Sequence, residues 1–573
     1  MKKSLSKTWK IGLTLLFGLV VFLFWRFRYP FALSYQEQLQ LFLFDDDYFW
    51  ERMSEPGGLA RYIAEFLVQF YNIVTVGALI IALLLMTVQR LTWRLMQRRV
   101  HYALSFIPAK MLWFAMGDEN VMLTYAVALV LALVAVLVLN KCLVLNKYLR
   151  LAILLLVLPL LYWLIGPLAL LVAVCIMPVS VVWVLAVMLL SAHYLPFPMQ
   201  RVMFGISYYR IPITVSYWLI VIPVIVAFVY WVHRLAKNMK TSPRMEVALA
   251  VVMVVLAFFM VPRHYDAKTY ELIEYDYLVR VGDWDAVIAK ADKQMPDLPM
   301  SVSATNLALG MTNQLGERAF DFYQRGIGGL LPQSERNFAT TQLSGEIYFN
   351  LGLVNTAQRF AFEAMEAIPN YNKSGRVVKR LAETNLINGQ YEVARKYLQM
   401  LEKTIFYRKW AQRMMTMLGD EKAINAHPLY GTMRQIRLQD DLLFSDRDLD
   451  KICGQLFLHN QQNMMAAQYL LMIPLLERDV PRFMRYVQVV QNRIPYNPRS
   501  CQEAIAFAFY QQRQNPPQGV VNQLTLQQMN EFASVYSQGK NSPELERFKN
   551  TVWYYLTGGA LNDKGGTSCL NDK

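Results

Sequence analysis

The sequence predicts an all-α protein, with a polytopic bundle of about seven to nine transmembrane helices in residues 1–262 and a soluble helical-repeat domain in residues 263–556. Hydrophobic residues make up 55% of the 573 positions, more than a single soluble core requires. Lys and Arg exceed Asp and Glu by 22 to 10 in residues 1–262, but only by 35 to 32 beyond them. Such an excess between apolar runs is typical of inner-membrane loops rather than of nucleic-acid binding. Residues 557–573 are predicted to be a flexible tail.

The apolar runs are long enough to cross a bilayer, because about 20 helical residues span roughly 30 Å of hydrocarbon. Counting every run gives eight, but the run 102–117 is short and contains Pro108 and Lys110, which makes it a candidate half-span. Prolines also interrupt the stretch 150–191, and broken helices are tolerated where they line protein or a cavity. Seven or nine crossings therefore fit the loop charges better than eight. The runs are 10–28, 65–89, 102–117, 121–140, 150–166, 168–191, 213–232 and 245–262.

Basic residues predict which ends of the bundle face the cytoplasm. Four lysines from Lys2 to Lys10 precede the first run, and no convincing cleavage site follows it, so we expect an uncleaved anchor with a cytoplasmic N-terminus. The connections 90–101 and 233–244 contain basic residues and no acid. Both are therefore expected in the cytoplasm.

Acidic residues predict one outward loop. Seven of the ten acids in residues 1–262 lie between Glu37 and Glu65, so the loop at about 29–64 is expected to face outward. The last run then leads outward and places the repeat domain on the extracytoplasmic side of a bacterial inner membrane. Eight full crossings would instead return this domain to the cytoplasm.

Three windows after residue 263 share a glycine, a large or branched residue two positions later and Val or Ala five positions later. They are Gly282-x-Trp284-x-x-Val287, Gly352-x-Val354-x-x-Ala357 and Gly389-x-Tyr391-x-x-Ala394. The glycines are 70 and 37 residues apart, close to two units and one unit of about 34 residues. This region resembles tetratricopeptide repeats, which pair two antiparallel helices per unit. The resemblance implies a surface for a protein partner, although most aromatic and alanine side chains in such folds only pack repeat against repeat.

The outward loop contains four candidate catalytic residues, Asp45, Asp46, Asp47 and Glu51. Carboxylates here could ligate a divalent cation through oxygen, or one could act as a general base if its pKa were raised. The alternative, which we favour from the residues alone, is that three adjacent aspartates form a solvated turn. An acidic loop after the first span resembles the GT-C class of glycosyltransferases over residues 1–70. That resemblance implies an essential carboxylate, a polyprenyl-linked sugar donor and a divalent cation as candidate cofactor.

A second candidate site is the segment 193–212, which contains Arg201 and Arg210 and no acid. Arginine suits bidentate contacts with phosphate, so these two residues are candidate ligands of a lipid phosphate. An interfacial belt of arginine and aromatic residues explains the same composition without a ligand. We identify no cofactor motif, because the six histidines lack zinc-type spacing and the five cysteines form no CxxC pair.

The whole chain is similar to a family of uncharacterised multi-pass membrane proteins known from Bacteroidota-type genomes. The segments that carry this resemblance are Glu37–Phe42, Pro56–Leu59, Glu65–Tyr71 and Asn463–Leu470. This resemblance implies a membrane bundle followed by a helical-repeat region, and it implies no particular activity. We therefore expect an envelope protein that contacts membrane lipids and a protein partner, with a glycosyltransferase as the alternative. A transporter has less support, because the spans show no internal repeat.

Overall fold

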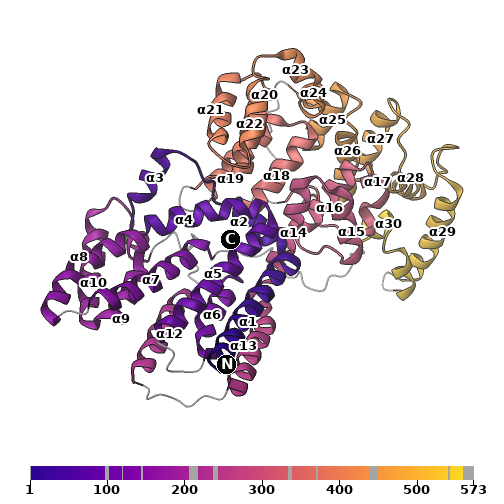
Figure 1. Ribbon diagram of the computed structural model, residues 1–573. Coiled ribbons are helices and arrows are strands. Elements are labelled where there is room, and N and C mark those ends of the chain that lie inside the picture. The colour runs from indigo at the N-terminus through magenta and orange to yellow at the C-terminus, as the bar shows by residue number, and fades with distance from the viewer. Residues whose placement is uncertain are drawn as a thin grey trace. The chain divides into compact units, whose positions relative to one another are not determined.

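The computed structural model describes residues 2–96, 102–118, 121–143, 146–204, 217–235, 243–332, 338–368, 372–438, 449–539 and 542–558 (Figure 1). Every extended regular element in these ranges is a helix, which confirms the predicted all-α class. The chain divides into two compact units. The first comprises Met1–Tyr270 with two short segments from later in the chain, Ile368–Arg376 and Gln399–Gln412, and the second comprises the remainder. The first unit thus extends past the boundary at residue 262 that composition predicts.

The first unit is built from apolar helices and from a group of polar and amphipathic helices inserted after the first of them. Its elements are α1 (Lys2–Leu23), η1 (Phe24–Arg28), α2 (Pro30–Glu37), α3 (Asp46–Met53), α4 (Gly58–Val68), η2 (Gln69–Asn72), α5 (Val74–Leu95), η3 (Tyr102–Ser105), α6 (Phe106–Ala115), α7 (Leu123–Cys142), α8 (Lys147–Ile165), η4 (Gly166–Leu168), α9 (Ala169–Ile176), η5 (Pro178–Ser180), α10 (Val181–Tyr194), α11 (Met199–Phe204), α12 (Trp218–Leu235), α13 (Pro243–Met260) and η7 (Val261–His264). Gly166 ends α8 at a φ of +68°, a conformation that favours glycine. Gly166, Pro167 and Pro178 thus divide the stretch 150–191 into separate helices.

Five helical segments in the described residues are long and apolar enough to cross a membrane. They are Trp9–Arg28, Val74–Leu95, Leu123–Cys142, Tyr148–Ile176 and Val247–His264. The apolar segments Pro178–Tyr194 and Trp218–Val232 are shorter, and α6, within the predicted half-span, has ten residues. A set of membrane-capable helices in the first half is confirmed, whereas the count of seven to nine crossings stays a prediction.

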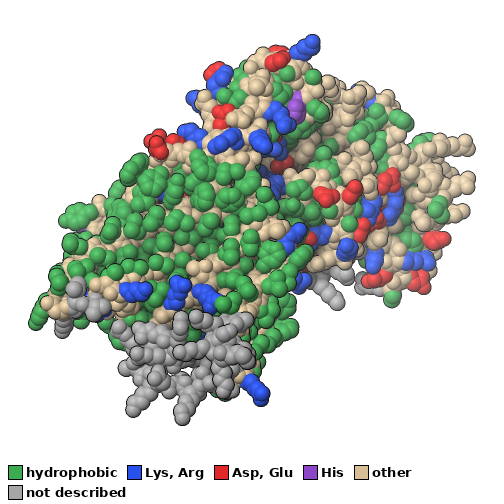
Figure 2. Space-filling model, viewed as in Figure 1, with side chains coloured by type: hydrophobic (Ala, Val, Ile, Leu, Met, Phe, Trp, Pro, Cys, Tyr) green, Lys and Arg blue, Asp and Glu red, His purple; other side chains and the backbone are tan. Residues whose placement is uncertain are grey.

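The outer surface of these helices is apolar. Leu156, Val182 and Phe228 are 79%, 72% and 67% exposed. Figure 2 shows hydrophobic side chains covering most of the visible face of the helices that precede residue 262. Soluble monomers seldom expose apolar patches larger than a few hundred Å². The surface therefore indicates membrane association.

A polar network inside the bundle joins α1, α5 and η3. The Thr14 hydroxyl lies 2.9 Å from Gln89 Oε1 and 2.5 Å from the Tyr102 hydroxyl, and Gln89 Nε2 donates to Ser105 Oγ at 2.6 Å. All four side chains are buried. Interhelical hydrogen bonds of this kind fix helix positions where no water competes.

The segment predicted as an outward loop is folded into α2, α3 and α4. α2 begins at Pro30, whose fixed φ suits the first turn of a helix. Asp46 and Asp47 occupy the first turn of α3, where negative charge stabilises a helix. Gly57, with a φ of +86°, turns the chain into α4 and donates its N–H to the carbonyl of Trp163 at 2.8 Å. The acidic residues are therefore held on short helices against the membrane bundle.

The C-terminal region consists of short helices joined by tight turns. Its elements are α14 (Ala267–Val281), α15 (Trp284–Lys293), α16 (Pro299–Met311), α17 (Leu315–Arg318), η8 (Ala319–Asp321), α18 (Phe338–Leu351), α19 (Val354–Glu366), α20 (Gly375–Ile387), α21 (Tyr391–Glu402), α22 (Arg408–Met415), α23 (Glu421–Ala426), α24 (Pro428–Ile436), α25 (Leu449–His459), α26 (Met464–Leu476), α27 (Val480–Gln491), α28 (Arg499–Gln511), α29 (Gln523–Gln538), η11 (Pro543–Phe548) and α30 (Val552–Leu556). Neighbours such as α18 and α19, or α25 and α26, pack directly on each other.

The glycines of the sequence motif form the turns between paired helices. Gly282, Gly352 and Gly389 have φ values of +72°, +98° and +77°. In each turn the residue after the glycine donates its N–H to a carbonyl five positions earlier, as Leu353 does to Tyr348 at 2.9 Å. This is the Schellman arrangement, which satisfies the free carbonyls at a helix end and favours glycine. The motif therefore marks real helical hairpins.

Three further hairpin turns lack glycine. Asn313, Arg478 and Arg513 have φ values of +57°, +62° and +54°, and the residue after each makes the same bond to a carbonyl five positions earlier. A left-handed non-glycine residue costs roughly 1–2 kcal/mol, so packing must offset this cost at all three turns. The region thus contains more hairpins than a search for glycine can find.

Candidate functional site

The predicted carboxylates lie around a small pocket in the first unit. Its volume is about 110 Å³. The lining residues are Leu41, Leu43, Asp45, Asp47, Tyr48, Glu51, Arg52 and Lys373. Of the four residues predicted as catalytic, Asp45, Asp47 and Glu51 line this pocket, whereas Asp46 is exposed and does not.

Asp45 forms an ion pair with Lys403. Its Oδ2 atom lies 2.5 Å from Nζ of Lys403, and the backbone N–H of Phe44 donates to the carbonyl of Lys403 at 2.8 Å. The hydrogen bond from Lys403 holds the pKa of the Asp45 carboxyl below its ordinary value. A general base at neutral pH needs a raised pKa, so Asp45 is poorly suited to that role.

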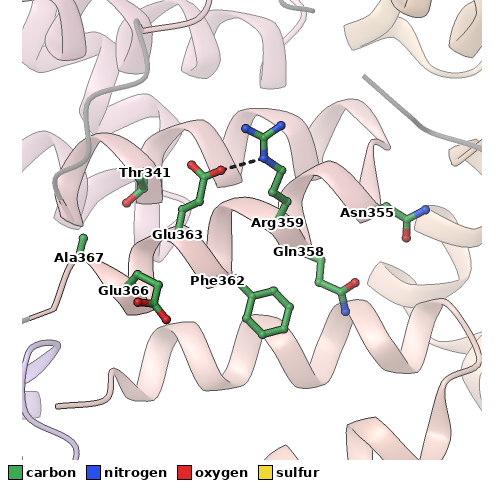
Figure 3. Close-up of a pocket in the computed structure, with 8 residues that line it drawn as sticks. All are labelled: Thr341, Asn355, Gln358, Arg359, Phe362, Glu363, Glu366 and Ala367. Carbon is green, nitrogen blue, oxygen red and sulfur yellow. Dashed lines mark hydrogen bonds and ion pairs between the residues drawn. The ribbon is translucent and has the colours of Figure 1, made fainter. Parts of the chain in front are cut away.

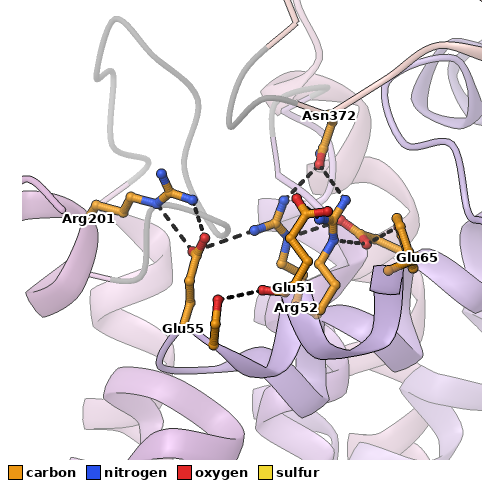
Figure 4. Close-up of polar contacts among 9 residues, drawn as sticks. Glu51, Arg52, Glu55, Glu65, Arg201 and Asn372 are labelled. Carbon is orange, nitrogen blue, oxygen red and sulfur yellow. Dashed lines mark hydrogen bonds and ion pairs between the residues drawn. The ribbon is translucent and has the colours of Figure 1, made fainter. Parts of the chain in front are cut away.

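A buried charged cluster, which shares Tyr48 and Arg52 with the pocket, joins α3, α4 and the segment around Asn372 (Figure 4). Nε of Arg52 lies 2.7 Å from Glu65 Oε2, and Nε of Arg61 lies 3.0 Å from Glu65 Oε1. The Tyr48 hydroxyl donates to the same carboxylate. Both arginines also donate to Asn372 Oδ1, Arg61 at 2.7 Å and Arg52 at 3.4 Å. The side chain of Glu65 is 1% exposed, so water contributes little to its solvation.

The surroundings of Glu65 keep its carboxylate ionised. Burial raises the pKa of Glu65, but the charges of Arg61 and Arg52 and the hydrogen bond from Tyr48 outweigh burial and leave it below the ordinary value. Burial and the neighbouring Glu65 raise the pKa of Tyr48 well above its usual range. This arrangement stabilises fixed charges and offers no group that would release or take up a proton near neutral pH.

A second group of charges extends the cluster toward α11. Arg201 donates from Nε to Glu55 Oε2 at 3.2 Å and from Nη2 to the other oxygen of that carboxylate. Nη1 of Arg61 lies 3.6 Å from the same Glu55. Arg201, a predicted ligand of lipid phosphate, thus has a carboxylate partner that its own segment of sequence does not contain. The other predicted ligand, Arg210, lies outside the described residues.

The residues at the centre of the cluster had no predicted role, because the sequence prediction named only Asp45, Asp46, Asp47 and Glu51 as catalytic candidates in this loop. Arg61 and Glu65 stand four positions apart on α4, and this spacing is a sequence signal for an ion pair on one helix face. Arg52 on α3 carries no comparable signal. Within the described ranges, no group of three or more His, Cys, Asp or Glu side chains could hold a metal ion.

The second unit contains a larger groove, of about 890 Å³, along α19 (Figure 3). Its lining residues are Thr341, Asn355, Gln358, Arg359, Phe362, Glu363, Glu366 and Ala367. The Phe362 ring is 47% exposed and gives the groove an apolar surface. Arg359 Nε pairs with Glu363 Oε1 at 2.8 Å, one helical turn away. The groove therefore combines an exposed ring with amide and carboxylate groups.

The chain belongs to a protein family of unknown function, DUF6057, whose model matches residues 6–559. The match covers both compact units and confirms the predicted resemblance of the whole chain to an uncharacterised family. No curated protein and no solved structure matched the chain.

Proposed function

We propose that this protein is a membrane-anchored binding protein whose tetratricopeptide-like helical hairpins hold an extended polypeptide on the extracytoplasmic side of the bacterial inner membrane. The groove along α19 carries this proposal. Its volume of about 890 Å³ suits several residues of an extended chain. Gln358 supplies an amide group that can pair with the backbone of such a chain.

The side chains of the groove also favour a particular peptide. Phe362 offers an exposed ring to an apolar residue. Glu363 is neutralised by Arg359, whereas the exposed Glu366 makes no ion pair within the described residues. A segment with an apolar residue followed by Lys or Arg would therefore complement both the ring and the remaining charge.

Site-specific photocrosslinking in cells tests this proposal. A photoreactive residue at Gln358 should give one discrete crosslinked product, which Phe362→Ala and Glu366→Lys should each reduce at least fivefold. The matched control places the same photoreactive residue at Tyr510, which is 49% exposed on α28. Equal products from both positions, or a product indifferent to both substitutions, would contradict binding in the groove.

A second candidate function is that of a GT-C-like glycosyltransferase with a polyprenyl-linked sugar donor. One observation favours it: Asp47 and Glu51 line the same pocket as the cationic side chain of Lys373. Cations can bind the phosphate of such a donor, and a carboxylate can accept a proton from the sugar acceptor. A divalent cation, if required, would have to be held by fewer protein carboxylates than a dedicated metal site uses.

Matched carboxylate variants test this second function. Asp47→Asn and Glu51→Gln should abolish transfer from a polyprenyl-linked donor in membranes, with or without added Mg²⁺. Asp46→Asn is the control, since Asp46 lies next in sequence but outside the pocket. Loss of product from all three variants, or from none, would argue against a catalytic pocket.

A further inference from the structure

α1 and α5 pack against each other and leave a groove between them on the surface of the bundle. Its volume is about 320 Å³. The lining residues are Ile11, Thr14, Leu15, Leu83, Met86, Thr87, Arg90, Leu91 and Arg94. Both helices contribute segments long and apolar enough to span a membrane, so this groove opens toward lipid rather than toward water.

One part of the groove is apolar and shaped by a glycine. Leu15 and Leu83 are 57% and 51% exposed on its two walls. A Cβ atom at Gly18 would lie 2.2 Å from Sδ of Met86, so a larger residue there would displace the Met86 side chain from its place across α1. The resulting channel has the chemistry to hold an acyl chain.

The other part of the groove is basic. Arg90 and Arg94 stand one turn apart on α5, and neither forms an ion pair or hydrogen bond within the described residues. The sequence contains no Asp or Glu between Glu65 and Asp118, so the chain that leads into and out of α5 brings no acid to these arginines. Figure 2 shows Lys and Arg side chains along the lower margin of the hydrophobic surface.

Nearby aromatic residues indicate the depth of these arginines. Nζ of Lys10 lies 4.6 Å from the centroid of the Trp93 ring and 5.2 Å from that of Trp9, an arrangement typical of the membrane interface. Arg90 precedes Trp93 on α5 and therefore lies about one turn deeper, roughly 5 Å farther from the interface. An arginine at that depth without a carboxylate is costly unless an anion or water solvates it.

The remaining polar groups of the groove are already engaged. The Thr87 hydroxyl donates to the carbonyl of Leu83 at 2.7 Å. The Thr14 hydroxyl belongs to the internal network with Gln89 and Tyr102. Recognition of a ligand in this groove must therefore come from the two guanidinium groups.

We propose that this groove is a binding site for an anionic phospholipid. One acyl chain lies along Leu15, Leu83 and Met86, and the headgroup phosphate accepts hydrogen bonds from Arg90 and Arg94. Guanidinium groups suit phosphate because they donate two parallel hydrogen bonds. A zwitterionic lipid brings its own cation beside the phosphate and so competes poorly for the arginines.

Native mass spectrometry of the full chain in micelles tests the proposal with phosphatidylglycerol and phosphatidylcholine of identical acyl chains. We expect phosphatidylglycerol to bind selectively, and Arg90→Gln with Arg94→Gln to weaken it at least tenfold, equivalent to ~1.4 kcal/mol. Arg28→Gln, at the other end of the first span, is the matched control for charge and should bind like the wild type. Leu83→Trp fills the groove without changing charge and should also lose the lipid.

Several results would overturn the proposal. These are equal binding of the two lipids, full retention by the double variant or by Leu83→Trp, and an equal loss in Arg28→Gln. Displacement of the lipid by millimolar inorganic phosphate would show that the arginines bind a free anion instead. The thermal unfolding midpoint of each variant, measured alongside, distinguishes a lost site from a lost fold.

Discussion

The substitution Glu65→Gln tests directly how much the buried charged cluster stabilises the first unit. The substitution keeps the size of the side chain but leaves the guanidinium groups of Arg52 and Arg61 without their shared counter-ion. These three side chains are 1% to 6% exposed, so solvent cannot replace the lost charge. The substitution should therefore destabilise the first unit rather than simply remove a surface interaction.

The expected loss follows from the remaining partners. Removing one member of a buried ion pair costs ~3–5 kcal/mol. Glu51 and Glu55 still lie 2.8 Å from Arg52 and 3.6 Å from Arg61, although Glu51 is 63% exposed and its charge is screened by water. We therefore expect about 3 kcal/mol, at the lower end of the range for a broken buried pair. Asn372→Ala removes only a neutral acceptor of charged donors and should cost ~1.5 kcal/mol.

The assay is equilibrium unfolding by SDS in mixed micelles, followed by the labelling of Cys175. This thiol is buried in the first unit, and a background with the other cysteines replaced by alanine isolates its signal. Asp46→Asn, an exposed acid outside the cluster, should stay within ~0.5 kcal/mol of the parent. A loss below ~1 kcal/mol for Glu65→Gln, or an equal loss for Asp46→Asn, would refute a stabilising cluster.

Three further predictions test charge, turn geometry and topology. The folded-state pKa of Glu65 lies below its ordinary value, so its contribution to stability is complete above the unfolded pKa of about 4.3 and is lost as the pH falls through the folded pKa. The difference in unfolding midpoint between wild type and Glu65→Gln should therefore shrink between pH 7 and pH 3. Gly352→Ala should destabilise the second unit by more than ~1 kcal/mol in denaturant titrations, since φ is +98° and the new Cβ would lie 3.1 Å from Ile436 Cγ1. Burial raises the pKa of the Cys453 thiol, so this cysteine should resist maleimide until the protein unfolds. The substitution Glu366→Cys should instead react with an impermeant maleimide added from the extracytoplasmic side. Labelling of this substitution only from the cytoplasm would reverse the proposed topology.

Local patterns in the sequence predicted much of the fold. Runs of apolar residues at membrane length correspond to helices such as α5 and α7, because hydrophobicity over 20 residues is a local property. The glycines at 282, 352 and 389 predicted hairpin turns, since a positive φ is a local requirement of the backbone. The glycine pattern did not predict the turns at Asn313 and Arg478, because packing and not residue type imposes their conformation.

Contacts between distant segments could not be predicted in this way. Arg61 and its partner Asn372 are 311 positions apart, and Asp45 and Lys403 are 358 apart. Arg201 similarly finds Glu55 across 146 positions. A single sequence contains no periodicity or spacing that links such residues, so the ion pairs of Asp45, Glu55 and Arg201 could not be predicted.

The ion pairs reduce the number of carboxylates that could be catalytic under the glycosyltransferase hypothesis. A catalytic carboxylate must reach its substrate and exchange a proton or bind a cation during the reaction. Asp45 is held by Lys403, and Asp46 lies outside the pocket. Glu65 is buried between two arginines with a lowered pKa. Transfer chemistry in this pocket would therefore depend on Asp47 and on Glu51, which pairs with Arg52 at 2.8 Å but is 63% exposed and so can reach a substrate. Activity that survives Asp47→Asn together with Glu51→Gln would leave the binding function as the account that the structure supports.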